Sequence, residues 1–325
     1  MLTELNDDAL RQYSDAKTAF LALYEAKKAA KEVRGSMFWR EVGGVEYLIR
    51  ANVSSAQKSL GRRTEETEAI YHSFVERKTF TSDRVSSLKE TVLKHQRLNR
   101  ALYVGHTPQI VIDLLNMLAE QGLMGFFTIV GTFALYAYET AAGVRIDNAG
   151  ALATQDVDLL WHNGKRLQFF THLNRTQERS MIRLLKKMDS SFQVDELDSG
   201  GYTATNNKAF QVDFIRAASR DGEPHPFAFS DDEDDLWPVP AKRAESLLSS
   251  PRLETVVVSV RGEMALMPTI YPYDFYKFKL WMATQHTRPE EKRRRDKTQA
   301  EVMLRMMKDY LPQYLPKDAP AETEG

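Results

Sequence analysis

The chain has 325 residues, and its 44 lysines and arginines against 45 aspartates and glutamates give a net charge of −1 at pH 7. This length allows two domains or one domain with a long appendage. The near-neutral charge excludes a global basic field, so any nucleic-acid binding must rest on local basic patches. The absence of cysteine excludes disulfides, thiol nucleophiles and thiolate zinc sites, and no apolar run approaches a membrane span, which predicts a cytoplasmic protein without a membrane partner.

The first third of the chain is predicted to be mostly helical. Apolar residues at three- and four-residue steps predict a helix over residues 8–34. Gly43-Gly44 lies between two apolar runs and predicts a β-hairpin over residues 37–50. Thr64 is suited to cap a helix, and a further helix is predicted over residues 82–102.

Two arginines, Arg62 and Arg63, immediately precede Thr64, the predicted cap. They have two interpretations: they grip the phosphates of a tRNA or a nucleotide, or they pair with the nearby glutamates. Pairing is the interpretation that we favour, because Glu65 and Glu66 follow directly.

The rest of the chain alternates between strands and helices. Predicted strands are 126–130, 156–161, 192–197, 208–215, 255–260 and 264–267, and predicted helices are 108–121, 133–141, 175–188, 272–281 and 288–311. The run of acids over residues 230–235 lacks the spacing and the turn glycine of a calcium loop, so it is predicted to be a solvated loop. Residues 317–325 are predicted to be a disordered tail.

The candidate functional residues are three aspartates and a turn that contains a glycine. Successive side chains alternate faces in a strand, so Asp156 and Asp158 point the same way and offer two hard oxygen ligands for Mg²⁺ or Mn²⁺. Asp213 is a single acid in a later apolar strand, where metal binding would offset its burial. Gly131-Thr132 opens a helix and lets backbone N–H groups approach phosphate oxygens. A solvated edge with nothing bound is the alternative for the first two acids alone.

This arrangement resembles the nucleotidyltransferase fold of the DNA polymerase β superfamily, and within it a bacterial group with an N-terminal helical extension. Further segments with the resemblance are 59–68, 131–139, 154–158 and 272–300. The chain departs from this superfamily in the distance from Gly131 to Asp156, which is longer than usual and includes a loop over residues 145–154.

The resemblance implies an α/β (α+β) fold, with a small mixed-sheet core, an N-terminal helical region and a C-terminal helical bundle. The expected parts are residues 1–105, 106–240, 241–316 and the tail. The implied activity is metal-dependent transfer of a nucleoside monophosphate from a nucleoside triphosphate to a hydroxyl of an RNA or tRNA end, a protein side chain or a small molecule, and a toxin role is one form of it. Which triphosphate and which oligomeric state the protein uses stay open.

The resemblance also implies roles for individual residues. Asp156, Asp158 and Asp213 would bind the metal and catalyse transfer, and Gly131 and Thr132 would hold the phosphates. A lysine from the first C-terminal helix would face the triphosphate; Lys279 matches best and Lys277 competes. The alternative is that Lys279 faces solvent.

Two other classes of function compete with this one. The core could be a catalytically idle scaffold that binds protein or RNA, although a scaffold has no need of three acids on one edge. It could also be a metal-dependent nuclease, which would not need the Gly131-Thr132 turn. The sequence lacks the motifs of P-loop ATPases, Rossmann dehydrogenases, zinc proteases and serine hydrolases.

Overall fold

The computed structural model describes residues 2–53, 56–196, 201–219 and 228–316. The chain divides into two compact units, which we name the hairpin unit (residues 11–102) and the core unit (residues 1–10 and 103–325). Residues 106–316, for which we predict two separate parts, all belong to the core unit. The tail predicted over residues 317–325 lies outside the described residues.

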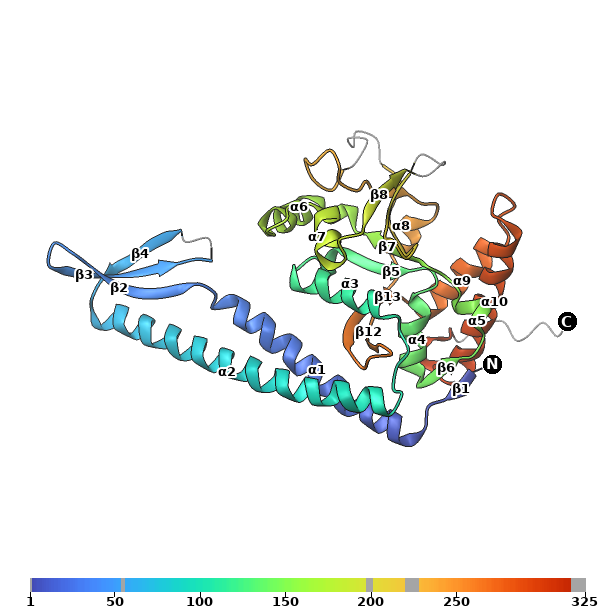
Figure 1. Ribbon diagram of the computed structural model, residues 1–325, viewed down its shortest axis with the longest axis horizontal. Helices are drawn as coiled ribbons and strands as arrows, with labels where there is room; N and C mark the ends of the chain where they lie inside the picture. Colours follow the sequence, from blue (N-terminus) through green and yellow to red (C-terminus); the bar gives the residue numbers. More distant parts are fainter. Residues whose placement is uncertain (1, 54–55, 197–200, 220–227, 317–325) are drawn as a thin grey trace. The chain divides into compact units, whose positions relative to one another are not determined.

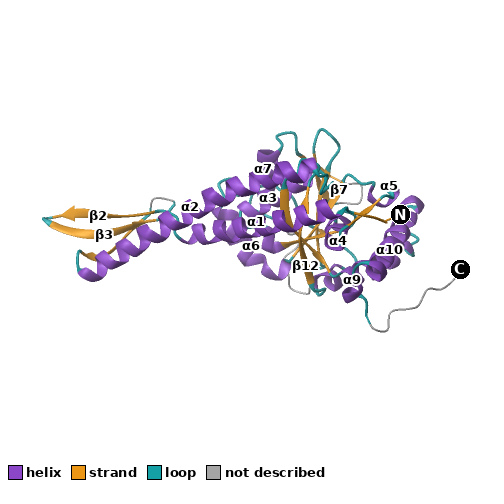
Figure 2. Cartoon of the chain, turned by 90° about the horizontal axis from the view of Figure 1, so that it is seen from below, coloured by secondary structure: helices purple, strands orange, loops and turns teal. Residues whose placement is uncertain are grey.

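Two long antiparallel helices make up most of the hairpin unit (Figures 1 and 2): α1 (Asp7–Glu32) and α2 (Glu65–Ala101). The buried positions of α1 recur at steps of three and four residues, as in a coiled coil, whereas α2 has only three buried residues, Thr67, Val92 and Asn99. Several of the buried residues of α1 are alanines, among them Ala16, Ala19 and Ala26. Within this seam Gln12 Nε2 donates to Asn99 Oδ1 over 2.8 Å, so the start of α1 lies beside the end of α2.

The second helix is continuous, so the prediction of a separate helix over residues 82–102 is wrong. Neither glycine nor proline interrupts it, and the Thr81 hydroxyl donates to the Arg77 carbonyl one turn back over 2.9 Å instead of capping a new helix. The predicted cap is confirmed: Thr64 accepts from the Thr67 backbone N–H, and Thr67 returns the bond to the Thr64 N–H.

A three-stranded antiparallel sheet completes the hairpin unit, with strands β2 (Ser36–Val42), β3 (Val45–Ala51) and β4 (Gln57–Arg62). The predicted hairpin is confirmed, and Gly43 and Gly44 form its turn with φ values of +61° and +77°. The sequence did not predict β4, because its residues are mostly polar and lack apolar alternation.

The core unit is built on a mixed sheet in the order β12-β13-β5-β7-β10-β9-β8, with β11 beside β10. Strand β7 is antiparallel to β5 and parallel to β10. The strands are β5 (Phe127–Val130), β7 (Asp156–Trp161), β8 (Gln193–Glu196), β9 (Tyr202–Thr205), β10 (Gln211–Arg216), β11 (Val239–Pro240), β12 (Arg252–Val258) and β13 (Met264–Ile270). The predicted mixed α/β class is confirmed.

Helices cover both faces of this sheet, and alternation along β7 assigns each residue to one of them. Val157 and Leu159 belong to the first hydrophobic cluster, which includes residues of α3 (Gln109–Glu120), α6 (Arg166–Arg175) and α7 (Met181–Met188). Leu160 belongs to the second cluster, which includes residues of α4 (Ala134–Ala142), α9 (Pro272–Ala283) and α10 (Glu290–Asp309). Asp156 and Asp158 therefore lie on the face of the second cluster.

Short elements complete the core unit. β1 (Leu2–Glu4) pairs with β6 (Val144–Ile146), and α5 (Ala149–Leu152) precedes β7, so the loop expected over residues 145–154 is partly ordered into regular structure. The helix α8 (Ala244–Leu248) follows β11, and 3₁₀ turns lie at Met124–Phe126, Asn163–Lys165 and Pro312–Tyr314. Among the described residues, no helix combines the length and the apolar composition needed to cross a membrane.

The helix predicted over residues 175–188 is shorter than expected, because α7 begins only at Met181. Its first backbone N–H groups, those of Met181 and Ile182, donate to the carboxylate of Asp235 over 3.0 and 2.8 Å. Asp235 is 2% exposed, so the prediction that residues 230–235 form a solvated loop is wrong at this position. A buried acid at a helix N-terminus satisfies donors that have no partner within the helix.

Replacing this cap is expected to destabilise the core unit. Asp235→Ala leaves two buried N–H groups unpaired and should lower the free energy of unfolding by about 2 kcal/mol in urea denaturation. Asp231→Ala, at an exposed position of the same loop, should change it by less than about 0.5 kcal/mol. Equal losses in the two variants would contradict the capping role.

Candidate active site

Three carboxylates lie on one face of the core sheet, and we name this group, Asp156, Asp158 and Asp213, the carboxylate edge. β7 and β10 run parallel, and Asp213 on β10 is the register partner of Asp158 on β7. Asp156 lies two residues before Asp158 on β7 and therefore on the same face. On β10, Val212 and Phe214 pack into the first hydrophobic cluster, so Asp213 alternates to the opposite face. All three acids therefore lie on the face that α4, α9 and α10 cover.

Gly131 directly follows β5 and lies against the central acid. Its φ is +70°, and a Cβ built on it would lie 2.0 Å from Asp158 Oδ2. A glycine is therefore required twice, for the left-handed backbone and for the approach of the carboxylate. The predicted turn brings its backbone to Asp158.

The acids perturb one another electrostatically. The pKa of Asp158 is raised to about 7. Burial is the largest cause and the nearby charges of Asp156 and Asp213 act in the same direction, whereas Lys279 and Arg288 oppose the rise. Burial also raises the pKa of Asp213, and the charge of Asp156 acts in the same direction. Like charges held in a partly buried site disfavour ionisation of one another.

The donor chemistry of this edge fits a hard divalent cation. Mg²⁺ and Mn²⁺ prefer carboxylate oxygens, and a cation at this edge would offset the burial and the repulsion that together raise the pKa of Asp158 and Asp213. Within the described ranges, however, no three histidine or acidic side chains lie close enough together to form a complete metal site. Asp156, Asp158 and Asp213 are thus the residues that could hold such an ion, from neighbouring positions on two strands.

The helix α9 brings a lysine to the same face. Lys279 is 3% exposed, and its charge acts on Asp158. The alternative in which Lys279 faces solvent is therefore wrong. The competitor Lys277 has an exposed side chain and pairs with Asp274 on its own helix over 2.8 Å.

A buried acid on α10 holds this lysine. Lys279 Nζ donates to Asp296 Oδ1 over 2.9 Å, and Arg288 Nε donates to Asp296 Oδ2 over 2.6 Å. Asp296 is fully buried. Burial lowers the pKa of Lys279, and Asp296 and Asp158 oppose that lowering. The two cations share one acid inside the fold, which keeps positive charge close to the carboxylate edge.

Thr132 lies beside the carboxylate edge, but its hydroxyl already has a partner. Gln299 Nε2 on α10 donates to Thr132 Oγ1 over 3.0 Å and to the Ala151 carbonyl over 2.6 Å. Gln299 Oε1 is buried and has no hydrogen-bond partner among the residues that the structure describes. The threonine hydroxyl keeps its own proton to donate, so it can still bind an oxygen of a ligand.

Sequence reasoning missed Asp296, Gln299 and Arg288. The signal was available for the first two, since Asp296, Gln299, Ala300 and Met303 recur at three- and four-residue steps and form the buried face of α10. A charged residue within such a stripe must have a partner. Arg288 precedes the helix, and nothing in its sequence environment indicates its role.

Comparison with known protein families matches residues 109–323 to one family model, described as a nucleotidyltransferase. The match begins at α3 and includes the three acids, Gly131 and both C-terminal helices. Searches of the curated proteins and of the solved structures gave no match.

The raised pKa of Asp158 predicts a pH-dependent cost in stability. An unfolded aspartate titrates near pH 4. Between about pH 4 and pH 7 the unfolded chain loses a proton that the folded chain keeps, so stability falls as the pH rises through this window. Asp158→Asn removes this cost and should raise the free energy of unfolding by about 2 kcal/mol at pH 8. At pH 4 the difference should vanish.

Thermal unfolding in EDTA at pH 4, 6 and 8 checks this prediction. EDTA removes divalent cations, which would otherwise stabilise the wild type through its carboxylates. A wild-type protein that is more stable than Asp158→Asn at pH 8 would contradict the assigned direction of the shift.

Proposed function

Because this chain belongs to a nucleotidyltransferase family, we propose that it transfers a nucleoside monophosphate to a hydroxyl of an acceptor through the carboxylate edge of β7 and β10. Membership supports the general activity and a nucleoside triphosphate as substrate. Assignment to the DNA polymerase β superfamily, dependence on Mg²⁺ or Mn²⁺, the site residues and the acceptor are our proposals. An RNA or tRNA end, a protein side chain or a small molecule could accept, and a toxin-like role is compatible with each.

One observation carries the proposal: three acids of neighbouring strands share one face, with Gly131 against them and a buried lysine beside them. Asp156 and Asp158 would hold a divalent cation there, and such a cation would supply positive charge that polarises the phosphorus of the triphosphate. The backbone at Gly131 and the hydroxyl of Thr132 bind phosphate oxygens, and the close approach at Gly131 excludes a side chain that would block them.

The reaction is an in-line displacement at the α-phosphorus. The acceptor oxygen forms a bond to this phosphorus, and the bond to the bridging oxygen of pyrophosphate breaks. Asp213 takes the proton of the attacking hydroxyl, a role that suits a carboxylate whose pKa burial has raised. Lys279 neutralises the charge that develops on pyrophosphate, and Asp296 positions Lys279.

Removing two of the acids should abolish ligand binding without unfolding the protein. We expect Mg²⁺ or Mn²⁺ with at least one of the four ribonucleoside triphosphates to raise the melting temperature of the wild type. The double variant Asp156→Ala/Asp158→Ala should lose this rise. Its stability without ligand should be unchanged or higher, because the repulsion among the acids is relieved. Thermal shift assays measure both effects.

A matched control loses the same charge elsewhere. Asp231→Ala/Asp234→Ala changes two exposed acids of the core unit and should keep the nucleotide-dependent rise. A wild-type protein that no triphosphate stabilises would contradict the proposal. Stabilisation by metal alone, together with cleavage of RNA or DNA, would favour the nuclease, and a strongly destabilised double variant would indicate a structural role for the acids.

A further inference from the structure

The two units of the chain differ in charge. Residues 11–102 contain 18 lysines and arginines against 11 aspartates and glutamates, so the hairpin unit carries +7, although the whole chain carries −1. The remaining residues therefore carry −8. A net charge close to zero hides a strongly basic unit, and an excess of this size attracts polyanions.

One face of the sheet in the hairpin unit is covered by the helix α2. The ring of Trp39 lies 5.9 Å from that of Tyr71, and the guanidinium of Arg50 lies 4.2 Å above the ring of Phe74. The acids of β2 and β3, Glu41 and Glu46, are register partners, and alternation assigns them to this same covered face.

The opposite face, which we name the open face, presents cations and aromatic rings without an acid from its strands. Arg40 on β2 is the register partner of Tyr47 on β3, and Tyr47 is the partner of Arg62 on β4. These three residues form a row across the sheet. The guanidinium of Arg40 lies 5.5 Å above the ring of Phe38 and donates to Gln57 Oε1 over 2.6 Å.

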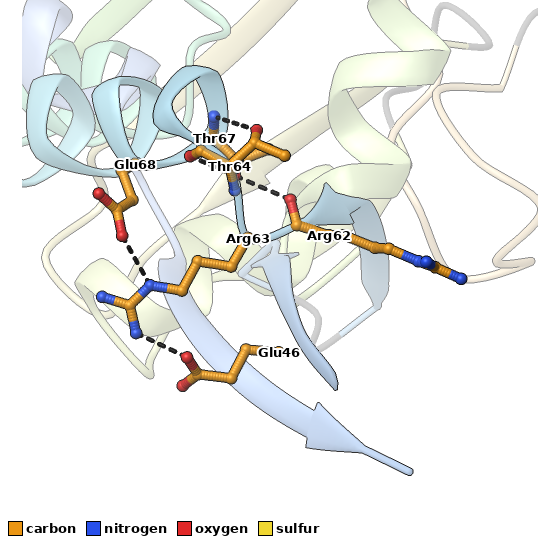
Figure 3. Close-up of polar contacts among 6 residues, drawn as sticks. All are labelled: Glu46, Arg62, Arg63, Thr64, Thr67 and Glu68. Atoms are coloured by element: carbon orange, nitrogen blue, oxygen red, sulfur yellow. Dashed lines mark hydrogen bonds and ion pairs between the residues drawn. The ribbon is translucent and has the colours of Figure 1, made fainter. Parts of the chain in front are cut away.

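Adjacent arginines on β4 and the following turn have different surroundings (Figure 3). Arg63 donates to Glu46 over 2.6 Å and to Glu68 over 2.7 Å, so this residue does pair with glutamates, although not with Glu65 and Glu66 as the sequence suggested. The side chain of Arg62 extends away from these acids, and no described residue bonds to its guanidinium. Arg62 is therefore the arginine that is available to an external ligand.

We propose that the open face, with Arg40, Tyr47, Arg62 and Phe38, binds unpaired nucleotides of a polynucleotide. Guanidinium groups contact phosphates, and the two rings provide surfaces on which bases stack without sequence preference. This inference rests on the proposed function in one respect, since it makes a nucleic acid the acceptor. Protein acceptors fit the open face less well, because two arginines on either side of a tyrosine ring suit a ligand in which phosphates alternate with flat bases.

Fluorescence anisotropy of the full-length protein tests this binding. The probes are a labelled 30-nucleotide RNA hairpin with a single-stranded 3′ end and the DNA of the same sequence, in 50 to 200 mM KCl. Arg40→Gln/Arg62→Gln should weaken binding at least tenfold at low salt and reduce the slope of log K against log salt by about 1.4, as expected for two lost phosphate contacts. Tyr47→Ala should weaken binding about tenfold, and Tyr47→Phe should retain most of it.

Matched controls separate the open face from general charge. Arg84→Gln/Lys89→Gln removes two exposed cations from α2 and should change affinity less than twofold. Tighter binding of RNA than of DNA identifies RNA as the ligand. Equal binding identifies the phosphate backbone, which both probes have, as the feature that the open face recognises. Failure of both probes to bind, or an equal loss in the α2 control, would overturn the inference. Arg62→Gln alone, at an exposed position, repeats the test without risk to the fold.

The outcomes for the two proposals are distinguishable. Asp156→Ala/Asp158→Ala should bind RNA as the wild type does, whereas Arg40→Gln/Arg62→Gln should keep its nucleotide-dependent thermal shift. A thermal shift without any nucleic-acid binding would leave the proposed transfer standing and remove only the polynucleotide acceptor.

Discussion

The burial of carboxylates close to one another is the constraint on which the candidate active site depends, because burial and like charge together raise the pKa of Asp158 and Asp213. β7 and β10 hold Asp158 and Asp213 in register, and Gly131 has no side chain, so the carboxylate of Asp158 can lie against the backbone that follows β5. The fold accommodates this charge by placing cations behind it. Lys279 and Arg288 share Asp296, and the positive charge of these two residues opposes, without cancelling, the rise in the pKa of Asp158. Such a site is costly when empty and is suited to a cation and a polyphosphate.

Alternation along strands made the acidic face predictable from sequence. The pattern D-x-D in β7 and a single acid between Val212 and Phe214 in β10 are enough to place all three carboxylates on one face. The ion cluster around Lys279 was not predictable in the same way. Arg288 and Asp296 lie 9 and 17 positions later in the sequence, and Asp296 reaches Lys279 through the packing of α9 on α10. Long-range capping has the same limit. Asp235 caps the start of α7 although it lies 54 residues after Met181, and no local sequence pattern indicates that contact.

The hairpin unit shows a different limit of sequence reasoning. Its helices follow the periodic pattern, and the glycine pair predicts the turn between β2 and β3. The third strand is polar, so only pairing with β3 identifies it and places Arg62 opposite Tyr47. Two neighbouring arginines with the same chemistry thereby acquire different roles: Arg63 holds the start of α2 to the sheet, and Arg62 faces outward.

The most direct test of the account follows the label of a nucleoside triphosphate. The protein, Mg²⁺ and total RNA are incubated with triphosphates labelled at either the α- or the γ-phosphorus. Transfer of a nucleoside monophosphate predicts that RNA retains the α-label and that the γ-label leaves as pyrophosphate, with neither retained in the presence of Asp156→Ala/Asp158→Ala. Retention of the γ-label, or shortening of RNA without triphosphate, would contradict nucleotidyl transfer at the carboxylate edge.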